Sequence, residues 1–138
     1  MKTQESSIQF LNVQFRESHI VFNRLGNYTI EINIQPKGTV IKAASQFILQ
    51  LRVNITDTEN GLSINVVSDS VFAYPPEADL SEFSNSLFVV NAPAIAFPYI
   101  RAYISGLTAL SGMPTLTLPT LNLSHIGETL KGNIDIVE

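Results

Sequence analysis

The 138-residue chain contains no cysteine and no tryptophan, and it has only two histidines, His19 and His125. Without cysteine the chain can form neither a disulfide nor a thiolate zinc site, and it has no thiol nucleophile. Zinc held by other side chains needs at least three ligands, whereas His125 and Glu128 supply two. We therefore expect no metal and no cofactor.

Charged residues are scarce, at 14% of the chain, and the net charge is −4. Six acidic residues and no basic residue fall between Asp57 and Glu82. This distribution argues against a nucleic-acid partner, because surfaces that bind nucleic acid are basic. The acidic stretch is either a solvated loop edge or a surface for a basic partner. A weakly charged surface also favours association with further copies.

Long uninterrupted apolar runs are absent as well. A membrane-spanning helix needs about 20 consecutive apolar residues, whereas Gly112, Pro114 and Pro119 interrupt the most apolar part of the chain. We expect two elements there and no membrane insertion. No apolar run follows the first five residues, so we expect no signal peptide and a cytoplasmic location.

Motifs of catalytic sites are missing too. The chain has no G-x-S-x-G elbow, no phosphate-binding glycine-rich loop and no dinucleotide fingerprint. Glu77 and Asp79 stand close together, but they lie in a proline-flanked segment where carboxylates are ordinarily solvated. We expect no enzyme and assign no catalytic residue. Catalytic groups that converge from distant positions remain the alternative.

Alternation of apolar and polar residues predicts strands over residues 28–35 and 46–56, and a further strand from Leu62. The sequence Asn60-Gly61 before Leu62 is typical of an antiparallel hairpin. Pro36-Lys37-Gly38 predicts a turn that ends the first of these strands.

Residues 8–25 alternate less regularly, because the apolar phase changes between Phe10 and Leu11. A β-bulge, which inserts one unpaired residue, explains such a change. Ile20 and Phe22 indicate either a continuation of this strand or a second edge strand.

The spacing of Ile100, Ile104 and Leu107 predicts a helix over residues 98–110. Pro98 suits its first position, and Gly112 suits its C-terminal cap. Gly106 weakens the helix interior, so a close approach of another element would explain it.

Residues 75–86 are predicted to form a loop, and residues 115–123 an extended segment over apolar surface. The tail after Ser124 is either helical or irregular, because Gly127 and Gly132 oppose the helical spacing of its apolar residues. This order of elements predicts one α+β domain, residues 1–138, in which a four-stranded antiparallel sheet packs against a long helix in the C-terminal half.

Residues 97–123 resemble the C-terminal core of the SecB family of export chaperones. The family pattern is a phenylalanine, proline and tyrosine followed by an arginine on a long helix, then a glycine-proline turn, then an apolar segment. The matching residues are Phe97, Pro98, Tyr99, Arg101, Gly112, Pro114, Pro119, Asn122 and Leu123.

The resemblance implies a bacterial, cytosolic, ATP-independent holdase that binds unfolded or nascent polypeptides in apolar surface grooves. It also implies a homo-oligomer, a dimer or a tetramer, in which long helices lie between sheets. Export members pass clients to the SecA translocase motor, whose basic tail binds an acidic face of the sheet.

The chain departs from the family pattern in two places. Thr120 and Leu121 both stand between the last proline and the asparagine, where the family usually has one residue. The short tail leaves little room for the family's second helix. Coupling to a translocase motor therefore stays open, as does service to a single partner such as an antitoxin or a phage protein. A small-ligand-binding domain or an enzyme is a further alternative.

Apolar residues of the crossover and of the uncharged segment are our candidates for client binding. They are Phe72, Tyr74, Leu80, Phe83, Phe88, Leu116 and Leu118. Apolar and aromatic residues of the long helix are assigned to the core or to an oligomer interface. They are Phe97, Tyr99, Ile100, Tyr103, Ile104 and Leu107. A place in the core or in the oligomer interface is the alternative for the first set.

Overall fold

The computed structural model describes residues 8–23, 25–85 and 87–138, except for the side chains of residues 83–85. The strands are β1 (Gln9–Phe22), β2 (Glu31–Ile41), β3 (Gln46–Asp57), β4 (Leu62–Ala73) and β5 (Ile134–Val137). The helices are α1 (Leu80–Asn85), α2 (Ala92–Leu110) and α3 (Leu123–Lys131), with a 3-10 turn at Lys42–Ala44 and a π-helical turn at Leu87–Asn91.

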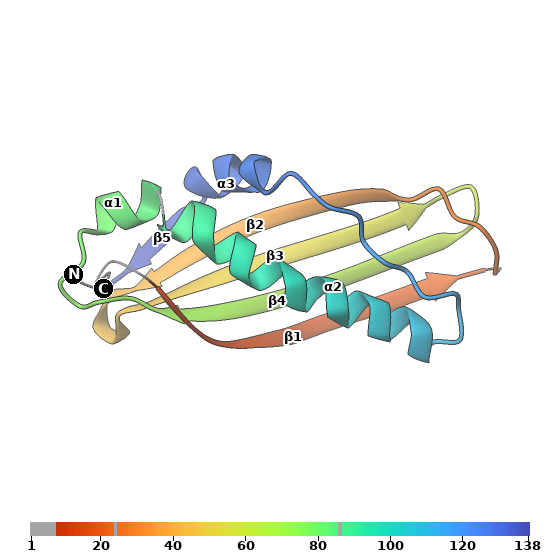
Figure 1. The fold of residues 1–138 in the computed structure, drawn as a ribbon, viewed down its shortest axis with the longest axis horizontal. Coiled ribbons are helices and arrows are strands. Elements are labelled where there is room, and N and C mark those ends of the chain that lie inside the picture. The colour runs from red at the N-terminus through yellow and green to blue at the C-terminus, as the bar shows by residue number, and fades with distance from the viewer. Residues whose placement is uncertain (1–7, 24, 86) are drawn as a thin grey trace, which may run out of the picture.

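The five strands form one sheet in the order β1-β4-β3-β2-β5. Helix α2 runs diagonally across one face of this sheet, and α3 lies on the same side (Figure 1). The α+β class, with four antiparallel strands and a long helix, is confirmed. The fifth strand, β5, was not predicted, and it pairs with β2 in parallel.

The core lies between the helices and one face of the sheet. Along β3 every second side chain is buried, from Phe47 through Leu51 to Ile55, whereas the residues between them are half-buried. This is the period of two that a strand with one covered face requires. The predicted hairpin is also present, because β3 and β4 are antiparallel and Gly61 at their turn has a φ of +70°.

The predicted bulge in β1 is confirmed by a register shift between Phe10 and Asn12. A second shift, between Phe15 and Glu17, was not predicted. The extra residue there is Arg16, whose Nε lies 2.7 Å from a carboxylate oxygen of Asp69 on β4.

Strand β2 does not end at Pro36, so the turn predicted at residues 36–38 is wrong. Pro36 pairs with Leu51 of β3, and the strand continues to Ile41. The Gly38 N–H donates to the Asn133 carbonyl, 3.0 Å away, on the outer side of β2. Because alternate residues of a strand point their backbone groups to the same side, the Pro36 nitrogen also faces outward. A missing N–H costs no ladder bond there.

The long helix begins at Ala92, so the start predicted at Pro98 is wrong. Pro93 occupies the first turn instead, and Pro98 lies inside the helix. An interior proline costs about 3 kcal/mol in an isolated helix. Burial of Ala96 and Phe97, the two residues before Pro98, offsets that cost.

The crossover that precedes α2 is also more helical than predicted. Residues 80–85 form α1, and Asp79 caps this helix by accepting hydrogen bonds from the Ser81 N–H at 3.1 Å and the Ser81 hydroxyl at 2.8 Å. The second of these bonds is the main reason that the pKa of Asp79 lies below its ordinary value. Among the described residues, the predicted loop is therefore confined to those before Leu80, and Ser86 lies outside the described residues.

The end of α2 matches the prediction for Gly112, which has a φ of +86°. The Met113 N–H donates to the Thr108 carbonyl and the Gly112 N–H to the Ala109 carbonyl, each at 3.3 Å. This pair of bonds is the Schellman motif. The reason proposed for Gly106 does not hold among the described residues of the protomer, because a Cβ at Gly106 would meet none of their atoms within 4 Å.

The helical stretch Leu80–Leu110 is long and apolar enough, by length and composition alone, to cross a membrane. Its most apolar window is 44% buried inside the protein. Ala92, Ile100 and Ile104 of α2 are fully buried in the core. The core helix of a soluble protein passes the same test, so length and composition do not distinguish a membrane-spanning helix from a core helix here.

Candidate functional site

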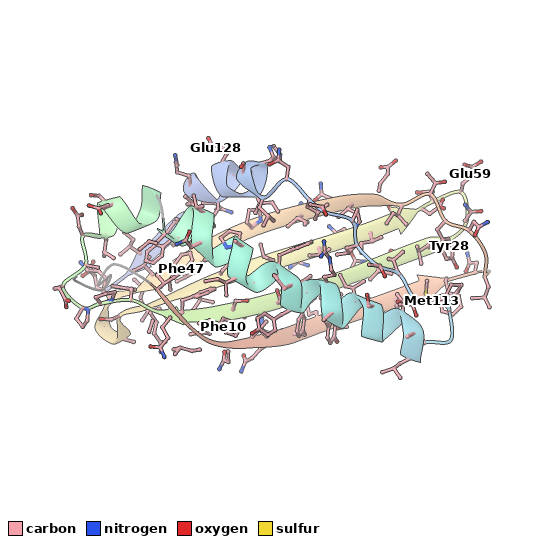
Figure 2. All side chains as sticks on the ribbon, viewed as in Figure 1. Phe10, Tyr28, Phe47, Glu59, Met113 and Glu128 are labelled. Atoms are coloured by element: carbon pink, nitrogen blue, oxygen red, sulfur yellow. The ribbon has the colours of Figure 1, made fainter. Side chains whose placement is uncertain are left out.

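Residues 113–122, which we call the strap, lead from the end of α2 back across the sheet to α3 (Figure 1). Figure 2 places Met113 at the far end of α2, where the strap begins. Leu118 of the strap is buried in the core, as expected for an extended segment over apolar surface. The course of the strap determines where α3 lies.

Three polar side chains of α2 hold the strap. The Thr108 hydroxyl accepts a hydrogen bond from the Leu116 N–H at 2.9 Å, and the Ser105 hydroxyl donates to the Leu116 carbonyl at 3.0 Å. Arg101 Nη2 donates to the Pro119 carbonyl at 3.2 Å. The spacing of four and three residues puts these side chains on one helix face.

Thr108 is fully buried and joins the helix to the strap. Its hydroxyl donates back to the helix, where the Ile104 and Ser105 carbonyls lie 3.0 and 3.1 Å away. The same oxygen is then free to accept from Leu116. One hydroxyl therefore satisfies a part-buried backbone N–H, and a buried group left without a partner costs about 1–3 kcal/mol.

Helix α3 starts where Asn122 accepts a hydrogen bond from the Ser124 N–H at 3.1 Å. Its buried residues are Ile126, Gly127 and Leu130, at helical spacing. A Cβ on Gly127 would lie 2.5 Å from the Val89 carbonyl oxygen, so glycine permits the close contact with the turn before α2. The tail is thus helical as far as Lys131, and a nine-residue second helix does fit in it before β5.

An apolar groove lies between β2 and α3, and we call it the β2–α3 groove. Its volume is about 360 Å³. It is lined by Ile32 and Ile34 of β2, Leu121 and Asn122 of the strap, and His125 and Ile126 of α3. Four of these six side chains are apolar, and the groove opens to the surface. It contains no acid or base apart from His125.

The outer edge of β2 runs beside this groove. In the part of the chain that the structure describes, β5 pairs with β2 only from Gly38 to Ile41. Ile32 and Ile34 have the same parity as Gly38, so their backbone N–H and C=O groups point outward, away from β3. Residues 31–35 therefore offer an unpaired strand edge next to an apolar surface.

A second hollow, of about 330 Å³, lies on the other flank of α3. Its lining includes Val90, Ala94 and Leu123, together with Glu128 and Lys131 of α3. Val90 is 60% exposed, so this hollow has an apolar side chain open to solvent. Helix α3 thus separates two surface depressions with apolar walls.

The predicted client-binding residues do not line the β2–α3 groove. Phe72, Tyr74, Phe88 and Leu118 are buried in the core. Phe88 stacks on Phe47 with ring centroids 4.1 Å apart, and Tyr74 meets Phe88 edge to face at 5.7 Å. Burial raises the pKa of Tyr74, although Lys42 nearby opposes this shift.

Leu80 and Leu116 are partly buried and pack against the core, and the side chain of Phe83 lies outside the described residues. The described side chains of this set are therefore packing residues of the protomer. Burial leaves Phe72, Tyr74, Phe88 and Leu118 inaccessible to a client in the protomer, whereas client binding through the partly buried Leu80 and Leu116 stays a prediction.

The residues assigned to the core or to an interface divide in two. Phe97, Ile100 and Ile104 are buried, and Leu107 is partly buried against the core. Tyr99 and Tyr103 stack on Phe10 and Phe15 of β1, with centroid distances of 4.8 and 3.9 Å. Tyr99 nevertheless remains 46% exposed.

The sequence contained weak signals of the groove. Ile32 and Ile34 were visible as the apolar side of a strand, but nothing local to them showed that the outer edge would stay unpaired. Ile126 and Leu130 have the spacing of a helix face, but Gly127 and Gly132 oppose a helix there. No three His, Asp or Glu side chains cluster as a metal site among the described residues.

We predict that Thr108→Val will loosen the strap. The variant keeps the shape of the side chain but removes the acceptor of the Leu116 N–H, so we expect a loss of about 1–3 kcal/mol in unfolding free energy and faster hydrogen exchange at the Leu116 amide. Thr117→Val, at an exposed position of the same segment, is the matched control and should change neither quantity. Equal effects of the two variants would contradict this role of Thr108.

No family model matches the chain, and no curated protein matches it. Among solved structures, the chain is similar to the Mycobacterium tuberculosis SecB-like chaperone Rv1957, solved in complex with a ChAD peptide from the Rv1956 HigA1 antitoxin. The TM-score is 0.68 at 17% identity, over 84% of this chain and 88% of that one. A Streptococcus agalactiae protein of unknown function aligns at 16% identity and a TM-score of 0.47, over 83% of this chain and 98% of that one. The chain has the SecB-like fold.

Proposed function

We propose that the protein is an ATP-independent, polypeptide-binding chaperone or binding module, which holds extended segments of non-native chains. The observation that carries this proposal is the β2–α3 groove beside an unpaired strand edge. The proposal includes a cytoplasmic location and no catalytic step.

The groove has the chemistry that an extended polypeptide requires. Ile32, Ile34 and Leu121 offer an apolar surface, and apolar contact with it does not require a particular client side chain. The outward backbone groups of Ile32 and Ile34 can pair with the backbone of any sequence. Recognition of this kind tolerates many sequences, because the main chain supplies the hydrogen bonds and the groove supplies apolar contact.

The neighbour Rv1957 supports a polypeptide partner, because it was solved with an antitoxin peptide. It fits a dedicated module for one partner about as well as a general holdase. The two forms differ in range: a holdase binds many unfolded proteins and suppresses their aggregation, whereas a dedicated module binds one chain.

Delivery of clients to a translocase motor is the less favoured form of the proposal. The sheet face away from the helices carries mixed charges rather than an acidic patch. Asp69 on this face is paired with Arg16, and Lys37 with Asp135 at 3.6 Å. Arg52 has the same orientation, because it alternates with the buried residues of β3. A basic tail would find few unpaired carboxylates there.

We predict that Ile34→Gln will weaken binding of a permanently unfolded chain, reduced and carboxymethylated α-lactalbumin, about tenfold. Burial of an isoleucine side chain contributes about 1.5–3 kcal/mol, and 1.4 kcal/mol corresponds to a factor of ten. The measurement is fluorescence anisotropy without ATP.

The matched control is Ile48→Gln, which makes the same change on the opposite face of the sheet at a similarly half-buried position. It should leave the affinity unchanged. If both variants bind as tightly as the original chain, the groove is not the binding site. If the original chain binds no unfolded protein at all, the general chaperone form is wrong and the dedicated form remains.

We further propose that the protein forms a homo-oligomer through the outer face of α2. The exposed residues Ala94, Ala102, Gly106 and Ala109 give this face a small and uncharged surface. No described residue fills the open space at Gly106, and Leu110 is 92% exposed. Small residues let another helix or sheet approach closely.

Light scattering should accordingly give the mass of a dimer or a tetramer, and Ala102→Glu should lower it, because the buried charge would lack a partner in the interface. Thr129→Glu, on the exposed side of α3, serves as the control and should preserve the mass. A monomeric original chain throughout the micromolar range is the result that rejects this interface.

A further inference from the structure

Strand β5 is a short strand on the outer edge of β2, and it is weakly held. It has four residues, of which Asp135, Ile136 and Val137 are exposed. Only Ile134 is partly buried, so little apolar burial and few residues hold this strand. Its charged contacts, Lys37 with Asp135 at 3.6 Å and Lys42 with Glu138 at 3.3 Å, are surface pairs that contribute little.

Gly38 of β2 allows a neighbouring strand to pack closely at the position where β5 begins. Gly38 has no side chain, and a Cβ there would lie 2.7 Å from Cε1 of Phe47 and 3.1 Å from Cγ1 of Ile134. Ile134 thus packs toward the core through the gap that Gly38 leaves. Asn133 adds a side-chain bond from its Nδ2 to the Pro36 carbonyl at 2.8 Å.

The line of β5 continues into the β2–α3 groove. Strand β5 begins to pair at Gly38. The residues of β2 that precede Gly38 on the same side of the strand are Pro36 and Ile34, and the Ile34 side chain lines the groove. The outward backbone groups from Ile32 to Val40 therefore lie along one edge, which lacks a donor only at Pro36. Strand β5 covers only the end of this edge.

We propose that β5 is a displaceable strand, and that an extended segment of a bound polypeptide takes its place on β2. This inference rests on the proposed function and adds a mode of binding to it. The segment has apolar, acidic and apolar residues in succession, as in Ile134-Asp135-Ile136, since Lys37 and Lys42 flank the site. Its apolar side chains lie in the β2–α3 groove and over Gly38, and β5 is released to solvent.

The backbone N–H groups of β5 face β2 and solvent alternately, so a proline at either of two neighbouring positions gives a matched pair of variants. Asn133 accepts a hydrogen bond from Gly38 through its backbone carbonyl, so the odd-numbered residues of β5 point their backbone groups toward β2. Val137→Pro removes an N–H that faces β2, whereas Ile136→Pro removes one that faces solvent. The two side chains are 51% and 52% exposed, so the loss of side-chain contact is matched.

The probe is a fluorescein-labelled peptide with the sequence of residues 132–138, measured by anisotropy against the full-length original chain and both variants. We expect Val137→Pro to bind the peptide about tenfold more tightly than the other two, because a larger fraction of its edges is vacant. Equal affinity of all three chains, or no binding by Val137→Pro, would overturn the proposal. If the peptide instead lowers the mass of an oligomer, β5 of a second copy is the occupant and the assignment to a client is wrong.

A second measurement uses the unmodified chain with saturating reduced, carboxymethylated α-lactalbumin. The amides of Asp135 and Val137 should lose protection from hydrogen exchange, while the Val40 amide, paired with the incoming strand, stays protected. If the unfolded chain binds and the protection at Asp135 and Val137 is unchanged, strand displacement is wrong and the proposed function stands. If no unfolded chain binds, the proposed function fails, and the peptide titration still decides whether the edge accepts a strand.

Discussion

The position of α3, and with it the β2–α3 groove, depends on the hydrogen bond between the Thr108 hydroxyl and the Leu116 N–H. The strap has no regular secondary structure, so its buried backbone groups need partners from elsewhere. Thr108 and Ser105 supply them for Leu116, and Arg101 supplies one for Pro119. With the strap fixed along α2, the chain arrives at β2 in the place where Asn122 can start α3.

The groove combines features that a folded protein usually avoids. An unpaired strand edge beside apolar side chains invites association with other chains. Here the edge is shortened by β5 at one end and interrupted by Pro36, which offers no donor. These features restrict self-association while they leave Ile32 and Ile34 accessible. The arrangement suits the proposed reversible contact with extended chains.

Much of the fold could be predicted because it follows from local patterns. The alternation in β3, the Asn60-Gly61 turn and the cap at Gly112 each reflect a constraint within a few residues. The errors at Pro36 and Pro98 have a different origin. Proline was interpreted as a boundary, yet at Pro36 the missing N–H faces the outer edge, and at Pro98 the burial of Ala96 and Phe97 offsets the lost bond. Neither condition is visible from the neighbouring residues.

The site was harder to predict than the fold. Exposed and buried aromatic residues have the same sequence signature, so Phe72 and Phe88 could not be told apart from groove residues until Phe47 was seen against them. The groove itself joins residues 32–34 with 121–126, which only the course of the strap brings together. Pairing over such a distance in sequence leaves no local pattern.

The most direct test of this account is photo-crosslinking from the groove. A benzoylphenylalanine in place of Leu121 should crosslink to an unfolded client, whereas the same group in place of Ile48, on the opposite face of the sheet, should not. Crosslinks from position 48 and none from position 121 would contradict the assignment of polypeptide binding to the β2–α3 groove.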